Sequence, residues 1–250
     1  MTLKEFFAQH PKAAAAFSGG TDSTFLLWAA REYGCQVQAY YVKTAFQPAF
    51  ELEDAQALAQ ALSIPLTVLE LDIFSCPEAV ANGPDRCYFC KRTLFTQLWS
   101  RARRDGHTLL LDGTNASDDA GDRPGMRALR ELEVRSPLRE CGVTKDQVRR
   151  LSREAGLFTW DKPAYACLAT RVPTGTAVTP EALQRVENAE NILFKMGFSD
   201  FRIRLLGKNA LLQLPESQMD RLLPRRAEIL EMLKPCFSKL YLDLEARHGQ

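Results

Sequence analysis

The chain has 250 residues, of which 46% are hydrophobic and 25% charged, and its formal net charge is +1. This length supports one large or two modest domains whose core needs no disulfide or metal to hold it together. The near balance of acids and bases disfavours a protein that coats long nucleic acids, because neutralising phosphates requires a basic surface.

The N-terminus and the cysteine content indicate where the protein resides. No apolar run approaches the roughly 20 residues that a membrane-spanning helix requires, and residues 1–10 lack the apolar core of a signal peptide. These ten residues mix charged and apolar side chains, which predicts an amphipathic helix packed on the domain. Seven cysteines, an odd number, disfavour a disulfide framework. We therefore expect a cytoplasmic protein with no membrane partner.

The first 155 residues predict strands and helices in alternation. The expected strands cover residues 12–17, 36–43, 66–71 and 108–111, and the expected helices cover residues 23–33, 50–62, 86–104 and 144–155. Strands that alternate with helices of this length imply a parallel sheet covered on both faces. Ligands of such sheets bind beyond the carboxyl ends of the strands. The glycine pair after the first strand and Gly113 after the fourth both fall at that edge.

Residues 156–179 break this rhythm with prolines and glycines, among them Pro163, Pro173 and Gly175. Beyond them the sequence predicts helices over residues 180–196 and 224–233 and strands over residues 201–206, 210–214 and 239–244. The expected organisation is an α/β parallel-sheet domain over residues 1–155, a linker over residues 156–179 and a small α+β domain over residues 180–250.

Residues 18–23 read Ser-Gly-Gly-Thr-Asp-Ser and lie between an expected strand and an expected helix. Glycines let the backbone turn tightly and bring N–H groups close to phosphate oxygens, and a helix start adds its positive end. Ser18 and Ser23 offer hydroxyl donors, and Asp22 offers a carboxylate to Mg2+. The lysine of the Walker motif is absent, which excludes that class of kinase or GTPase site. A glycine turn with a simple helix cap is the alternative, which the flanking strand and helix disfavour.

This string resembles the signature of the PP-loop ATP pyrophosphatases, which cleave ATP between the α- and β-phosphates. The resemblance implies an enzyme that adenylates a substrate oxygen and releases pyrophosphate, with ATP and Mg2+ as cofactors. It also implies the residues of the nucleotide site, which are Ser18, Gly19, Gly20, Asp22, Ser23 and Gly113.

Cys87 and Cys90 form a Cys-x-x-Cys pair at the start of an expected helix, where the helix dipole favours the thiolate. Alone, the pair is compatible with a redox pair, half a zinc site or two core cysteines. A structural zinc site uses four protein ligands. The chain has no second Cys-x-x-Cys, and His10, His107 and His248 have no ligand-like spacing.

Cys167 lies in the run Lys-Pro-Ala-Tyr-Ala-Cys-Leu-Ala-Thr-Arg-Val-Pro-Thr-Gly over residues 162–175. Together with residues 87–91, 112–115 and 122–125, this run resembles one PP-loop family, the sulfur transferases that build the nickel-pincer nucleotide cofactor of lactate racemase. The resemblance extends from the first strand to about Leu244. It implies a PP-loop domain, a small C-terminal domain and a homo-oligomer. The implied activity is adenylation of a carboxylate on a pyridinium dicarboxylate mononucleotide, followed by replacement of an oxygen with sulfur.

The resemblance implies roles for further residues. Cys167 matches the sulfur-bearing cysteine, and Glu190 matches an acidic catalytic position. The residues expected around the substrate phosphate are Arg202, Arg204, Thr170 and Arg171. The spacing of Arg202 and Arg204 places both on one face of a strand, which suits the binding of one anion. A solvated strand face is the alternative for this pair.

Members of this family obtain sulfur in two ways. Some have only the cysteine that matches Cys167 and sacrifice it, leaving dehydroalanine, and these lack cysteines that match Cys87 and Cys90. This chain has all three. Three thiolates can bind three irons of a 4Fe-4S cluster and leave the fourth iron open for a hydrosulfide. We therefore expect a cluster-dependent enzyme, with the sacrificial route second and the sulfur donor unassigned.

Three other functions stay open at this point. A PP-loop tRNA thiolase can also use three cysteines, but it needs a basic RNA-binding face that the net charge disfavours. An amide-forming synthetase needs an ammonia source and has no use for the three cysteines. A non-catalytic ATP-binding or iron–sulfur sensor has no need of Asp22 or of the paired arginines. The expected partner is therefore a small-molecule nucleotide substrate, not a nucleic acid.

Overall fold

The computed structural model describes residues 1–118 and 124–247. It consists of two compact units, which are described one at a time. Unit 1 comprises Met1–Thr44, Ala49–Cys76 and Asp85–Lys162, and unit 2 comprises Ala45–Pro48, Pro77–Pro84 and Pro163–Gln250. The main division falls after residue 162, inside the expected linker. Across the described ranges, no helix is both long enough and apolar enough to cross a membrane.

Unit 1 contains a parallel sheet of four strands, as the sequence predicts. The strands are β1 (Lys12–Ala16), β2 (Gln36–Lys43), β3 (Leu66–Glu70) and β4 (Leu110–Leu111), in the order β3-β2-β1-β4. The strand β4 has only two residues of the four expected from residues 108–111. On the side of β4 away from β1, Leu111 forms a single parallel bridge with Arg135.

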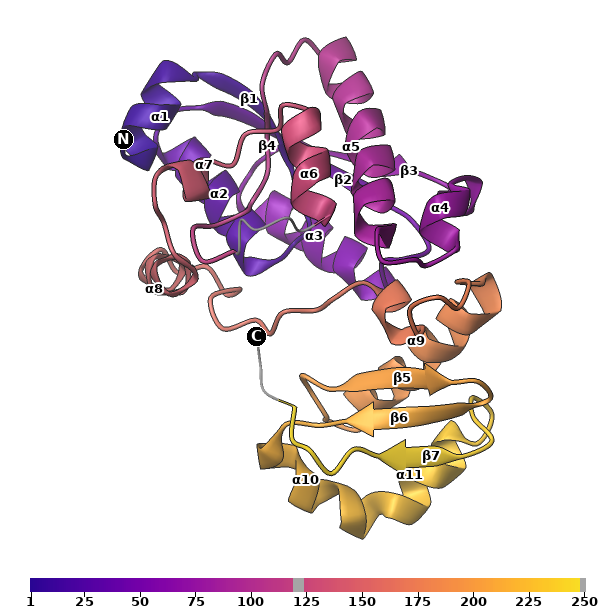
Figure 1. Ribbon diagram of the computed structural model, residues 1–250. Coiled ribbons are helices and arrows are strands. Elements are labelled where there is room, and N and C mark those ends of the chain that lie inside the picture. Colours follow the sequence, from indigo (N-terminus) through magenta and orange to yellow (C-terminus); the bar gives the residue numbers. More distant parts are fainter. Residues whose placement is uncertain (119–123, 248–250) are drawn as a thin grey trace. The chain divides into compact units, whose positions relative to one another are not determined.

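Helices cover both faces of this sheet (Figure 1). They are α1 (Leu3–Gln9), α2 (Thr21–Glu32), α3 (Ala49–Ala61), α5 (Arg86–Arg104), α6 (Pro124–Glu131), α7 (Pro137–Glu140) and α8 (Lys145–Glu154), with the 3-10 turn η1 (Ile73–Ser75). The predicted N-terminal amphipathic helix is confirmed as α1, which buries Phe6 and Phe7 and begins at a capping box on Thr2.

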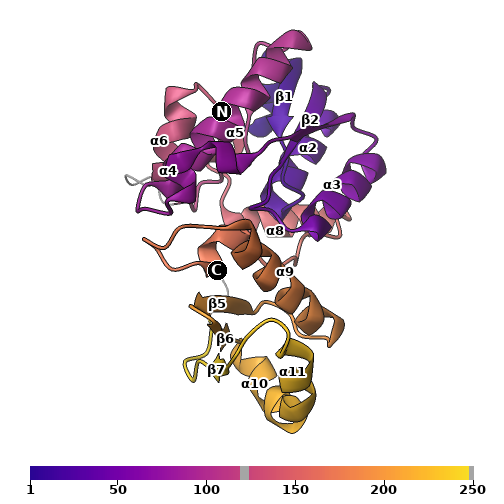
Figure 2. The same cartoon turned by 90° about the vertical axis from the view of Figure 1, so that its right-hand side faces the viewer.

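The two cores of unit 1 follow from the alternation of side chains along the strands. Ala13 and Ala15 of β1 face a core shared with α1, α2, α3, α7 and α8. Ala14, between them, faces a second core with α5 and α6. Figure 2 shows the sheet between α2 and α3 on one side and α5 and α6 on the other. A strand that is buried on both faces reads as a continuous apolar run, which is why residues 12–17 predict it.

Unit 2 contains a separate sheet of three strands. They are β5 (Arg202–Leu206), β6 (Asn209–Gln213) and β7 (Leu240–Leu242), in the order β5-β6-β7, with the first pair antiparallel and the second parallel. The helical segments are α4 (Pro77–Val80), α9 (Pro180–Lys195), α10 (Glu216–Leu222) and α11 (Arg226–Leu233), with the 3-10 turns η2 (Leu168–Arg171) and η3 (Leu223–Arg225). This confirms a small α+β part.

Asn82 explains why residues 77–84 belong to unit 2. Its side chain is buried, and its Nδ2 donates to the carbonyl oxygens of Val172, Pro173 and Thr176. The backbone N–H of Gly175 in turn donates to the carbonyl oxygen of Asn82. These long-range hydrogen bonds join a segment from the first half of the chain to the segment that follows Cys167.

Candidate functional site

The predicted nucleotide loop lies in unit 1 between β1 and α2. Gly19 has a φ of +71°, a left-handed conformation that favours glycine, and a Cβ there would lie 3.2 Å from the backbone nitrogen of Ala55. Gly20 is the N-cap of α2 and offers no side-chain oxygen to the first amides of the helix. Those amides, together with the dipole of a 12-residue helix, favour an anion at this position.

The serines and the glycine predicted for this site lie together. Ser18 Oγ lies 3.1 Å from Ser23 Oγ, and the Ser18 N–H donates to Ser23 Oγ at 3.3 Å. Gly113, which follows β4 and Asp112, packs against the start of α2, where a Cβ would lie 2.9 Å from the backbone nitrogen of Ser23. A side chain at residue 113 would therefore push the loop out of place.

Two lysines that the sequence analysis did not single out also contact this loop. Lys145, the first residue of α8, has its Nζ 2.6 Å from Asp22 Oδ2. Lys162 donates from Nζ to the carbonyl oxygen of Gly19 at 3.2 Å and to Asp54 Oδ2 at 2.6 Å. They bring two positive charges to a loop that lacks the Walker lysine. The sequence offers one hint of this role, for Lys145. A cation at the start of a helix opposes the helix dipole, so a lysine at that position suggests a purpose other than helix stability.

The motif at residues 112–115 supports the same loop. Buried Asp112 accepts hydrogen bonds from Ser136 Oγ and Thr114 Oγ1, which fixes the turn after β4. Asn115 is also buried, and its Nδ2 donates to Asp22 Oδ1 at 3.3 Å. In the neighbouring motif at residues 122–125, residues 122 and 123 lie outside the described residues.

Cys87 and Cys90 lie on one face in the first turn of α5, because residues three apart are neighbours on a helix. Cys87 is exposed and Cys90 is half-buried, and Arg86 Nη2 lies 3.7 Å from Cys87 Sγ. Cys167 belongs to unit 2, so the three cysteines come from both units. In residues 1–118 and 124–247, no three His, Cys, Asp or Glu side chains are grouped to hold a metal ion.

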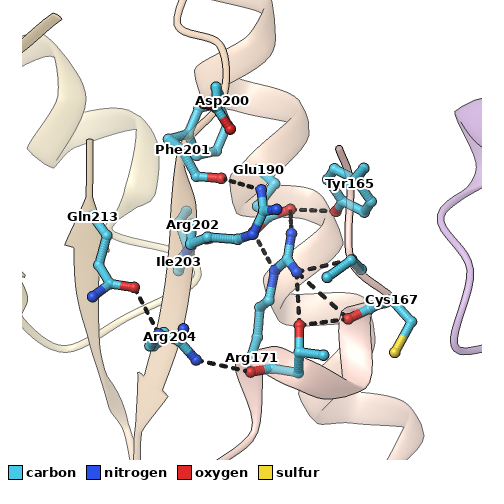
Figure 3. Close-up of polar contacts among 12 residues, drawn as sticks. Tyr165, Cys167, Arg171, Glu190, Asp200, Phe201, Arg202, Ile203, Arg204 and Gln213 are labelled. Carbon is cyan, nitrogen blue, oxygen red and sulfur yellow. Dashed lines mark hydrogen bonds and ion pairs between the residues drawn. The ribbon is translucent and has the colours of Figure 1, made fainter. Parts of the chain in front are cut away.

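In unit 2, Cys167 is the half-buried residue that precedes the turn η2. Its carbonyl oxygen accepts hydrogen bonds from the N–H of Thr170 at 2.9 Å and from Thr170 Oγ1 at 2.8 Å. The next N–H, of Leu168, donates to the carbonyl oxygen of Phe46 at 2.8 Å. The Cys167 sulfur points away from the polar contacts that hold its backbone (Figure 3).

Arg171 and Glu190 form an ion pair beneath this turn, and their side chains are 0% and 1% exposed. Arg171 donates from Nε to Glu190 Oε1 at 2.8 Å and from Nη2 to Glu190 Oε2 at 3.1 Å. Burial acts to lower the pKa of Arg171, but the hydrogen bonds and charge of Glu190 outweigh it, so this pKa is raised. The resemblance implies a substrate contact for Arg171 and a catalytic role for Glu190, whereas here their polar groups face each other.

The two arginines of β5 differ in exposure. Buried Arg202 donates to the carbonyl oxygens of Phe201 at 2.9 Å and Ala164 at 2.8 Å, and it forms no ion pair with the described residues. Burial, and then the charges of Arg171 and Arg247, lower the pKa of Arg202 to about 10. An anion bound beside it would offset this positive charge.

Arg204, two residues further along β5, is exposed. It donates from Nε to Gln213 Oε1 at 2.6 Å and from Nη1 to the carbonyl oxygen of Thr170 at 3.2 Å. The structure therefore brings Arg204, Arg202 and Thr170 to one region of unit 2, near Cys167. Of the two arginines, Arg204 is the one that a dissolved anion reaches directly.

Comparison with known proteins gives one family model and three relatives. The model described as queuosine biosynthesis protein QueC matches residues 12–81, which include β1, the loop and α2. An uncharacterized protein of Synechocystis is 39% identical over 222 residues, which cover 88% of this chain and 82% of that protein. An uncharacterized protein of Methanocaldococcus jannaschii is 28% identical over 244 residues, which cover 97% and 93%.

A third relative carries a functional name, pyridinium-3,5-bisthiocarboxylic acid mononucleotide synthase of Lactiplantibacillus plantarum. The two chains are 32% identical over 210 residues, which cover 83% of this chain and 76% of the synthase. The match spans most of both proteins, and the parallel sheet with its glycine loop agrees with it. The chain belongs to the family of this synthase, the PP-loop ATP-dependent sulfur transferases.

Proposed function

We propose that this protein adenylates a carboxylate of a pyridinium dicarboxylate mononucleotide and replaces one of its oxygens with sulfur, which supplies a thiocarboxylate for a nickel-pincer cofactor. The observation that carries the proposal is the 32% identity to the mononucleotide synthase over 210 residues. The cradle for phosphates in unit 1 and the cationic strand beside Cys167 in unit 2 support it.

In the first step, a carboxylate oxygen of the substrate attacks the α-phosphorus of ATP. The bond from that phosphorus to the bridging oxygen of the β-phosphate breaks, and pyrophosphate leaves with the electron pair. We assign the first amides of α2, Ser18 and Ser23 to the phosphates, and Asp22 to Mg2+. Lys145 and Lys162 would stabilise the charge that develops on the pyrophosphate, because fixed positive groups act most strongly where charge appears in the transition state.

In the second step, sulfur attacks the carbonyl carbon of the adenylate, the carbon–oxygen bond to AMP breaks, and AMP leaves. We assign Cys167 to the sulfur side of this step and the β5 arginines to the phosphate of the mononucleotide. Arg204 is exposed and can bind the phosphate directly. Arg202 would add its buried, unpaired charge to the same region.

For the sulfur source, we propose a 4Fe-4S cluster bound by Cys87, Cys90 and Cys167. The donor set fits such a cluster, since thiolates are its usual ligands and two of the three lie on one turn of α5. When bound, the cluster would supply an iron site open to a hydrosulfide. The alternative is sacrifice of Cys167. In that route its Sγ attacks the adenylate, and loss of the Cα proton then breaks the Cβ–Sγ bond, leaving dehydroalanine and the thiocarboxylate.

We also propose a homo-oligomer in the cytoplasm, which the family resemblance and the cysteine content support. Light scattering coupled to size-exclusion chromatography tests the first of these. A mass equal to a single 28.1 kDa chain at working concentration would contradict it.

Pyrophosphate release tests the adenylation step. Anaerobic protein is mixed with ATP, Mg2+ and the pyridinium dicarboxylate mononucleotide, and pyrophosphate is measured with and without the mononucleotide. We expect release that depends on the mononucleotide and that survives in Cys167→Ser, because the thiol acts only after adenylation. No pyrophosphate in the presence of both substrates would contradict the proposal.

A further inference from the structure

The carboxylate of Glu190 has no acceptor capacity left for a substrate. Oε1 accepts hydrogen bonds from Arg171 Nε at 2.8 Å and from the N–H of Ile203 at 3.2 Å. Oε2 accepts from Arg171 Nη2 at 3.1 Å and from the hydroxyl of Tyr165. A carboxylate offers about four acceptor positions, and all four are used. Since the side chain is also buried, Glu190 has neither exposure nor a free acceptor position to offer a substrate.

The guanidinium nitrogens of Arg171 likewise donate their hydrogen bonds to groups inside the protein. Besides the two bonds to Glu190, its Nη1 donates to the carbonyl oxygen of Ala166 at 2.8 Å and to Thr170 Oγ1 at 2.8 Å. The carbonyl oxygen of Cys167 lies 3.5 Å from the same nitrogen. The ring of Tyr165 covers one face of the guanidinium, with Arg171 Cζ 4.6 Å from the ring centroid. The Arg171 guanidinium therefore holds the segment on both sides of the Cys167 thiol, at Ala166 and at Thr170.

The neighbouring β5 strand joins the same arrangement. Arg202 Nη2 donates to the carbonyl oxygen of Ala164, and Ile203 anchors Glu190 through its backbone. The segment 164–171 is thus attached at several points to α9 and β5, as Figure 3 shows. Buried ion pairs contribute little net stability because of their desolvation cost. A pair that makes so many contacts to one segment is better explained by the geometry that it imposes on that segment.

We propose that Glu190 and Arg171 are positioning residues that fix the backbone of residues 164–171 and so set the direction of the Cys167 thiol. They contact neither the substrate nor the reacting atoms. Tyr165 completes the arrangement, because its hydroxyl donates to Glu190 Oε2, which also accepts from Arg171 Nη2. This inference goes beyond the proposed function, and its main test needs neither ATP nor the mononucleotide, so the two fail separately.

The test uses four variants of the full chain. Arg171→Met combined with Glu190→Leu replaces the ion pair by apolar side chains of similar volume, an exchange that buried pairs often tolerate. Glu190→Gln keeps part of the hydrogen bonding, and Tyr165→Phe removes one hydroxyl and leaves the ion pair. Arg221→Met is the matched control, since Arg221 is an arginine of α10 in the same unit whose Nη2 donates to the carbonyl oxygen of Gly197 instead.

Two measurements report on the segment. The first is hydrogen exchange of the peptide that covers residues 164–172. The second is the alkylation rate of Cys167 by iodoacetamide, measured by peptide mass spectrometry over a pH series and divided by the rate of Cys236 in the same sample. Cys236 is a half-buried thiol of unit 2 that makes no hydrogen bond to Arg171 or Glu190, so the ratio removes any general loosening of that unit.

We expect the hydrogen-exchange rate of this peptide to rise by about tenfold in the double variant. The hydrogen bonds to the charged pair limit local opening of the segment, and the variant lacks them. The Cys167 to Cys236 alkylation ratio should change with it, less in Glu190→Gln, least in Tyr165→Phe, and not in the control. If the double variant fails to fold, the two milder variants decide. Wild-type exchange and alkylation in every folded variant, or an unchanged thiol with a raised KM for the mononucleotide in Glu190→Gln, would overturn the proposal.

Discussion

At the scale of single residues, Lys145 carries a charge in a place that costs stability. It occupies the first position of α8, where the positive end of the helix dipole repels a cation. Its ion pair with Asp22 offsets this repulsion, but both side chains are partly exposed, and such pairs contribute less than about 1 kcal/mol. Stability therefore does not account for Lys145, whereas the proposed stabilisation of a leaving pyrophosphate would.

Lys145→Ala should lower the rate of pyrophosphate formation by about tenfold to a hundredfold, the effect of removing one electrostatic contact to developing charge. The urea midpoint should change little. The matched control is Arg150→Ala, which removes another cation of α8, one that pairs with Glu154 at the surface. A variant that keeps the wild-type rate would remove Lys145 from the mechanism.

Gly113→Ala should abolish ATP binding while the protein remains folded. The added methyl group would lie 2.9 Å from the backbone nitrogen of Ser23 and 3.0 Å from its Cα, so the start of α2 would have to move. Isothermal titration calorimetry with a non-hydrolysable ATP analogue measures the loss. Gly83→Ala serves as the control, because a Cβ there has no atom within 4 Å. Equal affinity in both variants would show that the close approach of Gly113 is unimportant.

His107 should make the protein less stable as the pH falls below 6.5, the ordinary pKa of a histidine side chain. Burial, and then the charge of Lys12, lower the pKa of this residue in the folded state. The unfolded chain therefore takes up the proton first, and the stability due to neutral His107 decreases as the pH falls from 6.5 through the lower pKa of the folded state. Urea unfolding at about pH 7.5 and about pH 5.5 should show a larger difference for the wild type than for His107→Gln. Equal differences would contradict this account.

At the scale of helices and strands, the sequence predicts the long elements and misses the short ones. Strands buried on both faces read as apolar runs, and α5 and α9 have helical periodicity over many residues. The helices α4 and α7 have only four residues each, too few for any periodicity. The shortening of β4 also depends on its neighbours, because only two of its residues pair with β1.

The site follows the same division. The loop residues are consecutive, so the sequence motif alone predicts them as a nucleotide-binding loop. The spacing of Arg202 and Arg204 likewise predicts that both lie on one face of a strand. Lys162 is separated from Gly19 by 143 positions, so only the folded chain reveals their contact. The pairing of Arg171 with Glu190 is also invisible in the sequence, because burial decides whether a charged residue faces the solvent or a partner.

The first turn of α5 should bind iron. After anaerobic reconstitution we expect about four irons and four labile sulfides per chain, with the absorbance of a 4Fe-4S cluster. Cys87→Ala should lose them, because one of three thiolate ligands is gone, whereas Cys236→Ala, outside the three-cysteine set, should keep them. Colourless protein that acquires dehydroalanine at Cys167 during turnover would instead establish the sacrificial route.

At the scale of the whole molecule, the residues proposed for the chemistry are divided between the two units. Unit 1 holds the nucleotide loop, its two lysines and the Cys-x-x-Cys pair, and unit 2 holds Cys167 and the β5 arginines. Lys162, which contacts the loop, is the last residue of unit 1, and the segment that carries Cys167 follows it directly. In the proposed mechanism, adenylation and sulfur transfer therefore depend on residues of different units, of which Lys162 and Cys167 are close neighbours in the sequence.

The most direct measurement is the mass of the nucleotide product. Reconstituted protein is incubated anaerobically with ATP, Mg2+, the pyridinium dicarboxylate mononucleotide and sulfide, and the small molecules are analysed by high-resolution mass spectrometry. We predict a product in which sulfur replaces a carboxylate oxygen, formed with AMP and pyrophosphate and absent with Cys167→Ser. A mononucleotide recovered without sulfur, although ATP has been split to AMP and pyrophosphate, would contradict the assignment of this chain as a sulfur transferase for that substrate.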